Sequence, residues 1–149
     1  MPHPVGRGPA SAAQPITPDG AFARPGCDHG AMPERHSRPV PGGRAFYLTE
    51  RLWELAAGLP VESVPIDSIK EFDEDCWFGG MPVTCRMVAR HADRIQKADL
   101  SYPVILSADG RLMDGGHRLA KAWLSGMTTI DAVRFTVDPE PDHIERGPS

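Results

Sequence analysis

The chain has 149 residues and a formal net charge of −4, a length that favours a single domain. Residues 1–43 carry four Lys or Arg and three Asp or Glu, which leaves twelve basic and seventeen acidic residues for the rest, the opposite of the balance typical of duplex-DNA binding. Three cysteines without a CxxC pair, no apolar leader and no membrane-length apolar stretch favour a cytoplasmic, non-membrane protein over a disulfide scaffold.

Residues 1–43 hold nine of the sixteen prolines and almost no run of large apolar side chains. Such a segment buries too little surface to offset the entropy of ordering it, which predicts a disordered Pro/Gly-rich tail. The folded domain is therefore expected over 44–140. The charged, proline-containing end at 141–149 is predicted to be flexible.

Within the domain, apolar periodicity and turn residues predict helices that alternate with strands. The expected helices are 46–57, 84–98 and 119–125. The expected strands are 61–66, 102–106, 111–113 and 129–137. These elements predict a single α/β (α+β) domain with a small mixed sheet, in which the 102–113 hairpin lies near the centre and the last two helices pack on the sheet.

The stretch Asp114-Gly115-Gly116-His117-Arg118 links the predicted hairpin to the predicted helix. Two glycines permit positive φ and let backbone N–H groups approach a ligand, and the start of a helix supplies unpaired N–H groups and a positive dipole. His117 and Arg118 add positive charge where that dipole disfavours it, so an incoming anion would relieve the conflict. Asp114 can orient His117, bind a metal ion or act as a base.

A simpler interpretation of the same stretch is structural. Asp114 can serve only as a helix N-cap, and the two glycines can simply make a tight turn. The hairpin before the stretch and the amphipathic helix after it favour the functional interpretation, because they are the context that such a motif requires.

The stretches Pro103-Val104-Ile105-Leu106, Asp109–Met113, Asp114–Arg118 and Ala120-Lys121-Ala122, with Gly126 and a strand after them, resemble the ParB/sulfiredoxin superfamily. The resemblance covers about residues 60–137. It implies a small α/β fold and, as in several members, binding of nucleotide phosphates at the turn. Members include sulfiredoxins that use ATP, partition proteins that bind CTP and kinases that phosphorylate free serine.

Departures from the superfamily patterns narrow the prediction. Sulfiredoxins carry a cysteine in this turn, whereas Gly116 directly precedes His117 here. Partition proteins have an arginine-rich turn and a following DNA-binding domain, whereas about a dozen residues follow the last predicted strand here. The Asp-Gly-x-His-Arg form is most similar to the free-serine-kinase branch, which implies that Asp114 and His117 lie at a phosphoryl-transfer site.

The acidic run Glu71, Asp73, Glu74 and Asp75 can hold Mg²⁺ or supply a general base, with Glu71 and Asp73 as the leading candidates, or it can be a solvated loop. Trp77 and Phe78 can stack on a base or anchor the loop to the core. For the remaining candidates we favour structural or solvated roles and no metal site. His91 is expected to be a packed histidine, and Arg86, Arg90 and Arg94 form a basic stripe at spacing i, i+4, i+8. The cysteines lack the spacing of zinc ligands; they are Cys27, Cys76 and Cys85.

These observations predict a nucleotide-binding domain that transfers or hydrolyses a phosphoryl group. Gly115, Gly116, His117 and Arg118 would bind the phosphates of ATP, ADP or CTP, with Mg²⁺ as a candidate cofactor. Asp114 and His117, with Glu71 or Asp73, would act on a small-molecule acceptor. The alternative is a nucleotide- or ligand-responsive regulatory module without turnover.

Overall fold

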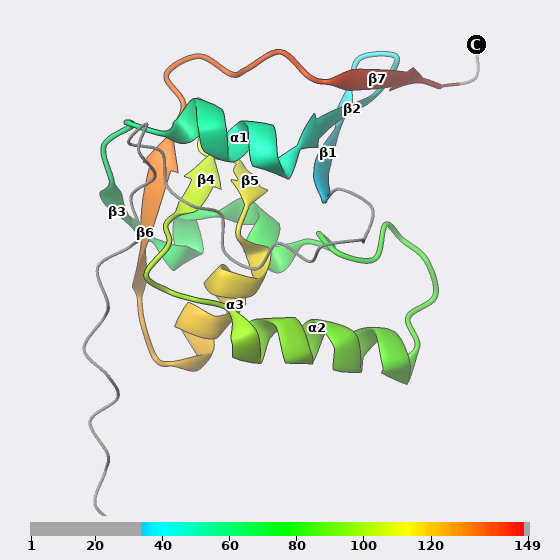
Figure 1. The fold of residues 1–149 in the computed structure, drawn as a ribbon. Coiled ribbons are helices and arrows are strands. Elements are labelled where there is room, and N and C mark those ends of the chain that lie inside the picture. Colours follow the sequence, from blue (N-terminus) through cyan, green and yellow to red (C-terminus); the bar gives the residue numbers. More distant parts are fainter. Residues whose placement is uncertain (1–33, 148–149) are drawn as a thin grey trace, which may run out of the picture.

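The computed structural model describes residues 34–147, which form two small sheets and three α-helices (Figure 1). The four-stranded sheet has the order β3-β6-β4-β5, with strands at Glu62–Pro65 (β3), Val104–Leu106 (β4), Leu112–Asp114 (β5) and Thr129–Arg134 (β6). Because β4 and β6 pair in parallel and the other neighbours are antiparallel, the sheet is mixed. The predicted α+β class with a small mixed sheet is confirmed.

The position predicted for the hairpin within this sheet is wrong in part. β4 is an inner strand, but β5 lies at the edge rather than near the centre. The reason is that β6 returns after the last helix to pair with β4 on the side away from β5. The end of β5, where Asp114 lies, therefore stands at an open edge of the sheet.

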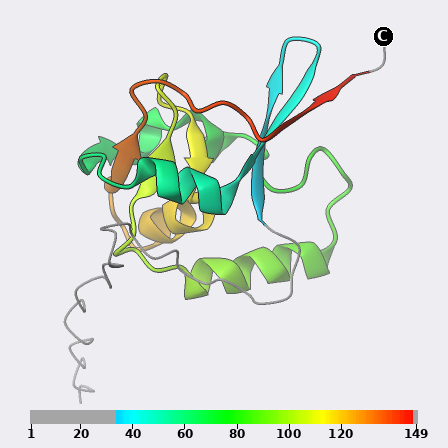
Figure 2. The ribbon, with the colours of Figure 1, turned by 45° about the horizontal axis from the view of Figure 1, so that its top comes forward.

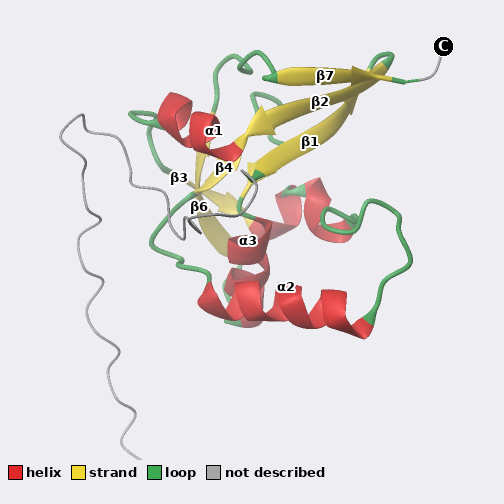
Figure 3. Ribbon diagram, turned by 45° about the vertical axis from the view of Figure 1, so that its right-hand side comes forward, coloured by secondary structure: helices red, strands yellow, loops and turns green. Residues whose placement is uncertain are grey.

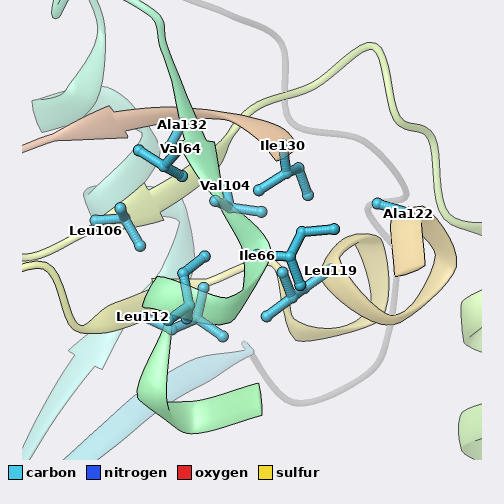
Figure 4. Packing of buried hydrophobic residues seen from close by; sticks show 10 residues of the cluster. Val64, Ile66, Val104, Leu106, Leu112, Leu119, Ala122, Ile130 and Ala132 are labelled. Carbon is cyan, nitrogen blue, oxygen red and sulfur yellow. The ribbon is translucent and has the colours of Figure 1, made fainter. Parts of the chain in front are cut away.

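The helices are Thr49–Ala56 (α1), Cys85–Lys97 (α2) and Gly116–Leu124 (α3), and two short 3₁₀ helices lie at Ile66–Ser68 (η1) and Lys70–Asp73 (η2). Neighbouring residues of a strand point to opposite sides of a sheet. In the four-stranded sheet, both sides pack against buried side chains. Val104 and Leu106 pack with Leu119 of α3 (Figure 4), whereas Ile105 packs with Trp53 of α1. Two cores thus fix β5 and the start of α3 between α1 and η2.

The second sheet was not expected from the sequence. It has the order β1-β2-β7, with strands at Arg35–Val40, Gly43–Leu48 and His143–Arg146, and it extends from the body of the domain (Figures 2 and 3). Residues 35–43 were placed in the predicted tail and 141–149 in the predicted flexible end, so both boundaries are wrong for the described residues. The first 33 residues, with Cys27, lie outside the described part.

Local chemistry explains why this second sheet forms. Gly42 adopts φ +78° in the turn, and Pro39 is tolerated because β1 is an edge strand that needs no further donor there. Ala45 and Tyr47 of β2 are buried against α1. The predicted helix 46–57 therefore begins only at Thr49, with Leu48 as its N-cap.

α2 begins as predicted, because the Thr84 hydroxyl accepts a hydrogen bond from the Met87 N–H (3.2 Å). None of its residues is buried, and it packs along α3 on the side of the molecule away from α1 (Figures 1 and 3). His91 and Ile95 are half-buried, whereas Val88 is 52% exposed. Across residues 34–147, no helix has the length and apolar character needed to cross a membrane.

Candidate functional site

The turn between β5 and α3 is built around Gly115, which adopts φ +111°. A Cβ atom at this position would lie 2.6 Å from Val104 Cγ1 and 3.0 Å from Arg118 Nη2. Only glycine fits both the backbone conformation and the space. The chain can therefore leave an edge strand and begin a helix without an intervening loop.

α3 begins at Gly116, with Gly115 as its N-cap. The Leu119 N–H donates to the Gly115 carbonyl (2.9 Å), so the N–H groups of Gly116, His117 and Arg118 have no acceptor within the helix. The backbone at Gly115 and Gly116 is partly accessible. The simpler interpretation in which Asp114 is only the N-cap does not hold.

Asp114 instead accepts hydrogen bonds from side chains on the inner side of the turn. Its Oδ2 accepts hydrogen bonds from Arg118 Nη2 and from Trp53 Nε1, both at 2.9 Å, and the Arg118 guanidinium lies 5.2 Å from the Trp53 ring centre. The Arg118 side chain is 9% exposed. Arg118 was predicted to hold phosphates, but the structure directs it inward to the carboxylate.

His36 of β1 adds a further titratable group to this network. Burial, followed by the nearby Arg38, lowers its pKa to about 4, while the Asp114 carboxylate acts in the opposite direction. His36 is therefore uncharged at neutral pH. Asp114 lies at the meeting point of β1, α1 and α3.

Three rings lie on the outer side of the turn. His91 Nδ1 and His117 Nε2 are 2.8 Å apart and share a hydrogen bond. The Trp77 ring stacks on both imidazoles, with each pair of ring centres 4.8 Å apart and the planes within 10° and 5° of parallel. Trp77 thus partly covers the position at which an anion would approach His117.

His117 is uncharged in this arrangement. Burial, followed by the neighbouring His91, lowers its pKa to about 4, and burial also lowers the pKa of His91. A neutral imidazole can donate one hydrogen bond and accept another but contributes no positive charge. Because Nε2 of His117 faces His91, only Nδ1 remains for another partner.

The loop that carries Trp77 is held in place by Asp75. Its carboxylate accepts hydrogen bonds from the N–H groups of Gly80 (2.9 Å), Phe78 (2.7 Å) and Trp77 (3.1 Å), and these bonds lower its pKa. Trp77 Nε1 would lie 3.0 Å from a Cβ added at Gly116. Glycine at 116 therefore permits the close approach of this loop to the turn.

A pocket of about 280 Å³ opens beside Gly116. Glu71, one of the two leading acidic candidates, lies in its wall, so the structure brings Glu71 to the turn. Glu71 Oε1 lies 3.7 Å from Arg111 Nε, and Oε2 is buried without a partner. Asp73, the other candidate, is exposed and does not line the pocket.

Among the remaining candidates, His91 and Cys76 lie at the turn, whereas the three arginines and Cys85 are exposed on α2. Arg86, Arg90 and Arg94 are exposed along α2. Cys76 lies beside Gly116, with its Sγ 3.6 Å from the position of an added Cβ, and Cys85 is exposed at the start of α2. Within the described residues, no three His, Cys, Asp or Glu side chains form a group that could hold a metal ion.

Two members of the site were missed from the sequence. Trp53 lies in the predicted first helix and packs in the core, and its indole N–H also holds Asp114. His36 lay in the segment predicted to be a tail. Only the indole N–H, which requires a partner when buried, could have pointed to a carboxylate near Trp53.

The chain matches none of the protein-family models, curated proteins or solved structures with which it was compared. The resemblance of residues 60–137 to the ParB/sulfiredoxin superfamily therefore stays a prediction.

The two half-buried histidines, His36 and His117, predict that acid destabilises the fold. Both have pKa values of about 4 in the folded protein against an ordinary value of 6.5, so the unfolded chain binds more protons between these values. The contribution of the two neutral histidines to the free energy of unfolding is therefore fully present above about pH 6.5 and is lost as the pH falls toward about 4. Urea unfolding between about pH 7 and pH 5 should show this loss, and His36→Gln and His117→Gln should each flatten the slope. His143→Gln, at an exposed strand position, is the control; equal slopes in all variants would contradict the assignment.

Proposed function

We propose that this chain is a ParB/sulfiredoxin-like domain that binds nucleotide phosphates at the start of α3 and transfers or hydrolyses a phosphoryl group. The observation that carries the proposal is the turn itself: Gly115 at φ +111° leads directly into three N–H groups without helical acceptors. Such groups and the helix dipole favour a bound anion. The cysteine content is consistent with action in a reducing cytoplasm.

The charge around the turn constrains how phosphates would bind. Arg118 is paired with Asp114 and His117 is neutral, so the main-chain N–H groups and His117 Nδ1 would supply hydrogen bonds rather than countercharge. Countercharge would come from Mg²⁺ bound with the nucleotide. Both described contacts of Asp114 fall on Oδ2, and carboxylate oxygens of Asp114 and Glu71 are of the kind that Mg²⁺ prefers.

Glu71 is the better candidate for a general base. It lines the pocket next to Gly116, and one of its oxygens has no partner. An acceptor hydroxyl in the pocket would give its proton to the Glu71 carboxylate. The oxygen of that hydroxyl would then bond to the terminal phosphorus of the nucleotide as the nucleoside diphosphate leaves. Asp114 would mainly position the turn.

A module without turnover is the second candidate. The observation that favours it is the cover formed by Trp77, which stacks on His117 and contacts Gly116. In that case nucleotide binding would displace the Trp77 loop and report to a partner. The two functions share the phosphate-binding turn and differ only in chemistry.

Purified protein with Mg²⁺ and ATP, ADP or CTP separates the candidates. Phosphate release or transfer, assayed with and without a panel of small hydroxyl compounds, should be lost in Glu71→Gln while nucleotide affinity is retained. Saturable binding without turnover across the panel supports the module. Absence of binding to all three nucleotides overturns both.

His117→Ala should weaken nucleotide binding about tenfold, because it removes one hydrogen bond to a charged phosphate. Calorimetric titration of the wild type and the variant measures the change. His143→Ala, at an exposed histidine of β7, should leave the affinity unchanged. Equal affinities of all three proteins would remove His117 from the site.

A further inference from the structure

The pocket beside Gly116 has an apolar floor and aromatic walls. Leu119 and Ala120 of α3 form part of it, and Phe72, Trp77 and Phe78 line it from the preceding segment. Trp77 and Phe78 lie edge to face, with ring centres 6.3 Å apart. The volume of about 280 Å³ suits a small organic molecule rather than a metal ion.

The charged residues of the pocket all have the same sign. Glu71, Glu74 and Asp75 line it, and no lysine, arginine or histidine does. Asp75 stays ionised, because the N–H groups of Gly80 and Phe78 hold its pKa below the ordinary range. The field of these side chains in the pocket is therefore negative, while the start of α3 at Gly116 contributes the positive end of a helix dipole.

One carboxylate oxygen at this wall lacks a partner. Glu71 Oε2 is buried without a hydrogen-bond partner among the described residues, and Oε1 is 3.7 Å from Arg111 Nε; Glu71 and Arg111 both line a second, neighbouring pocket. An unpaired buried carboxylate oxygen is costly, so Glu71 would gain by turning toward a positively charged ligand in the pocket beside Gly116.

We propose that this pocket binds a small organic ammonium compound, held by cation–π contact with the aromatic walls and by the Glu71 carboxylate. Aromatic side chains combined with carboxylates favour organic cations over neutral molecules of the same shape. The same negative field opposes a ligand carboxylate, so a zwitterion of similar size should bind more weakly than the cation.

The inference does not depend on nucleotide binding, since it rests only on the pocket. A test with the cation alone therefore separates its failure from that of the proposed function.

Three probes of similar shape test the proposal: choline, its neutral carbon isostere 3,3-dimethylbutan-1-ol, and glycine betaine. NMR titration of the full chain follows the three indole N–H signals, and the Trp77 signal is assigned from Trp77→Phe. Choline should shift the Trp77 signal with an affinity at least about tenfold above that for the neutral isostere and the zwitterion. Equal affinities for choline and the isostere, or no shift at Trp77, would overturn the proposal.

Glu71→Gln should weaken choline binding about fivefold without changing the response to the isostere. Asp67→Asn removes the same charge from an exposed position on η1 that does not line the pocket, and it should have no effect. If Glu71→Gln does not fold, Glu74→Gln, at an exposed position of the pocket wall, replaces it with the same expected direction. Unchanged choline affinity in the folded glutamate variant contradicts the role of the carboxylate.

Discussion

Asp114→Ala should lower the free energy of unfolding by about 3 kcal/mol, the lower end of the loss typical when one member of a buried ion pair is removed, because the Asp114 side chain is still 22% exposed. The Arg118 guanidinium, whose side chain is 9% exposed, would lose its countercharge, and the Trp53 indole N–H would lose its acceptor. Urea unfolding at neutral pH measures the change. The Asp114 carboxylate links the turn to α1 through Trp53, so its loss is expected to have a large effect.

The chain offers a matched control for this prediction. Lys97 and Asp93 on α2 have the same i, i+4 spacing and the same 2.9 Å separation, but their side chains are 75% and 56% exposed. Asp93→Ala should therefore cost at most about 0.5 kcal/mol. Adding Arg118→Met to Asp114→Ala should recover at least half of the loss, because the unpaired charge is gone. Similar losses for Asp114→Ala and Asp93→Ala would show that burial does not decide the energy.

Gly115→Ala should cost about 3 kcal/mol or more. A residue with a Cβ is strained by about 1–3 kcal/mol at such a φ, and the Cβ would in addition lie 2.6 Å from Val104 Cγ1. Thermal and urea unfolding give the loss. The variant should also weaken nucleotide binding, since the clash moves the start of α3.

Gly126→Ala separates the two causes. Gly126 follows α3 at φ +83°, and nothing lies within 4 Å of an added Cβ, so only the backbone strain of about 1 kcal/mol applies. A loss for Gly115→Ala no larger than that for Gly126→Ala would contradict the packing argument. At the end of α3, the Met127 N–H donates to the Ala122 carbonyl (3.0 Å) and the Gly126 N–H to the Trp123 carbonyl (3.0 Å), a pattern typical of a helix that ends at a glycine.

Local sequence patterns were sufficient where local rules decide the structure. The Thr84 cap, the Asp109–Gly110 turn and the glycine-led start of α3 depend on neighbouring residues alone. Glu71 lines the pocket beside Gly116, whereas Asp73, the other leading acidic candidate, does not.

Contacts between distant segments could not be predicted in the same way. β7 pairs with β2, from Gly43 opposite Arg146 to Phe46 opposite His143, at a sequence distance that periodicity does not reveal, whereas β1 and β2 form a local hairpin. Trp123 of α3 is 55% exposed although an aromatic side chain in an amphipathic helix favours burial, and its ring centre lies 6.0 Å from that of Phe72.

Arg118 pairs with Asp114 in the structure, although the sequence predicts that it binds phosphates. The sequence shows a cation in the first turn of a helix, where the dipole disfavours it, and the prediction was that a bound anion relieves this. In the structure the carboxylate of Asp114, four residues earlier, supplies that negative charge from within the chain. The phosphate-binding role therefore falls to the main-chain N–H groups and His117.

Titration of ¹⁵N-labelled protein with Mg²⁺–ATP, compared with adenosine, tests this role most directly. We expect the N–H signals of Gly116, His117 and Arg118 to shift saturably with ATP and to stay in place with adenosine, which lacks phosphates. Signals that stay in place with ATP, or that move equally with adenosine, would contradict phosphate binding at the start of α3.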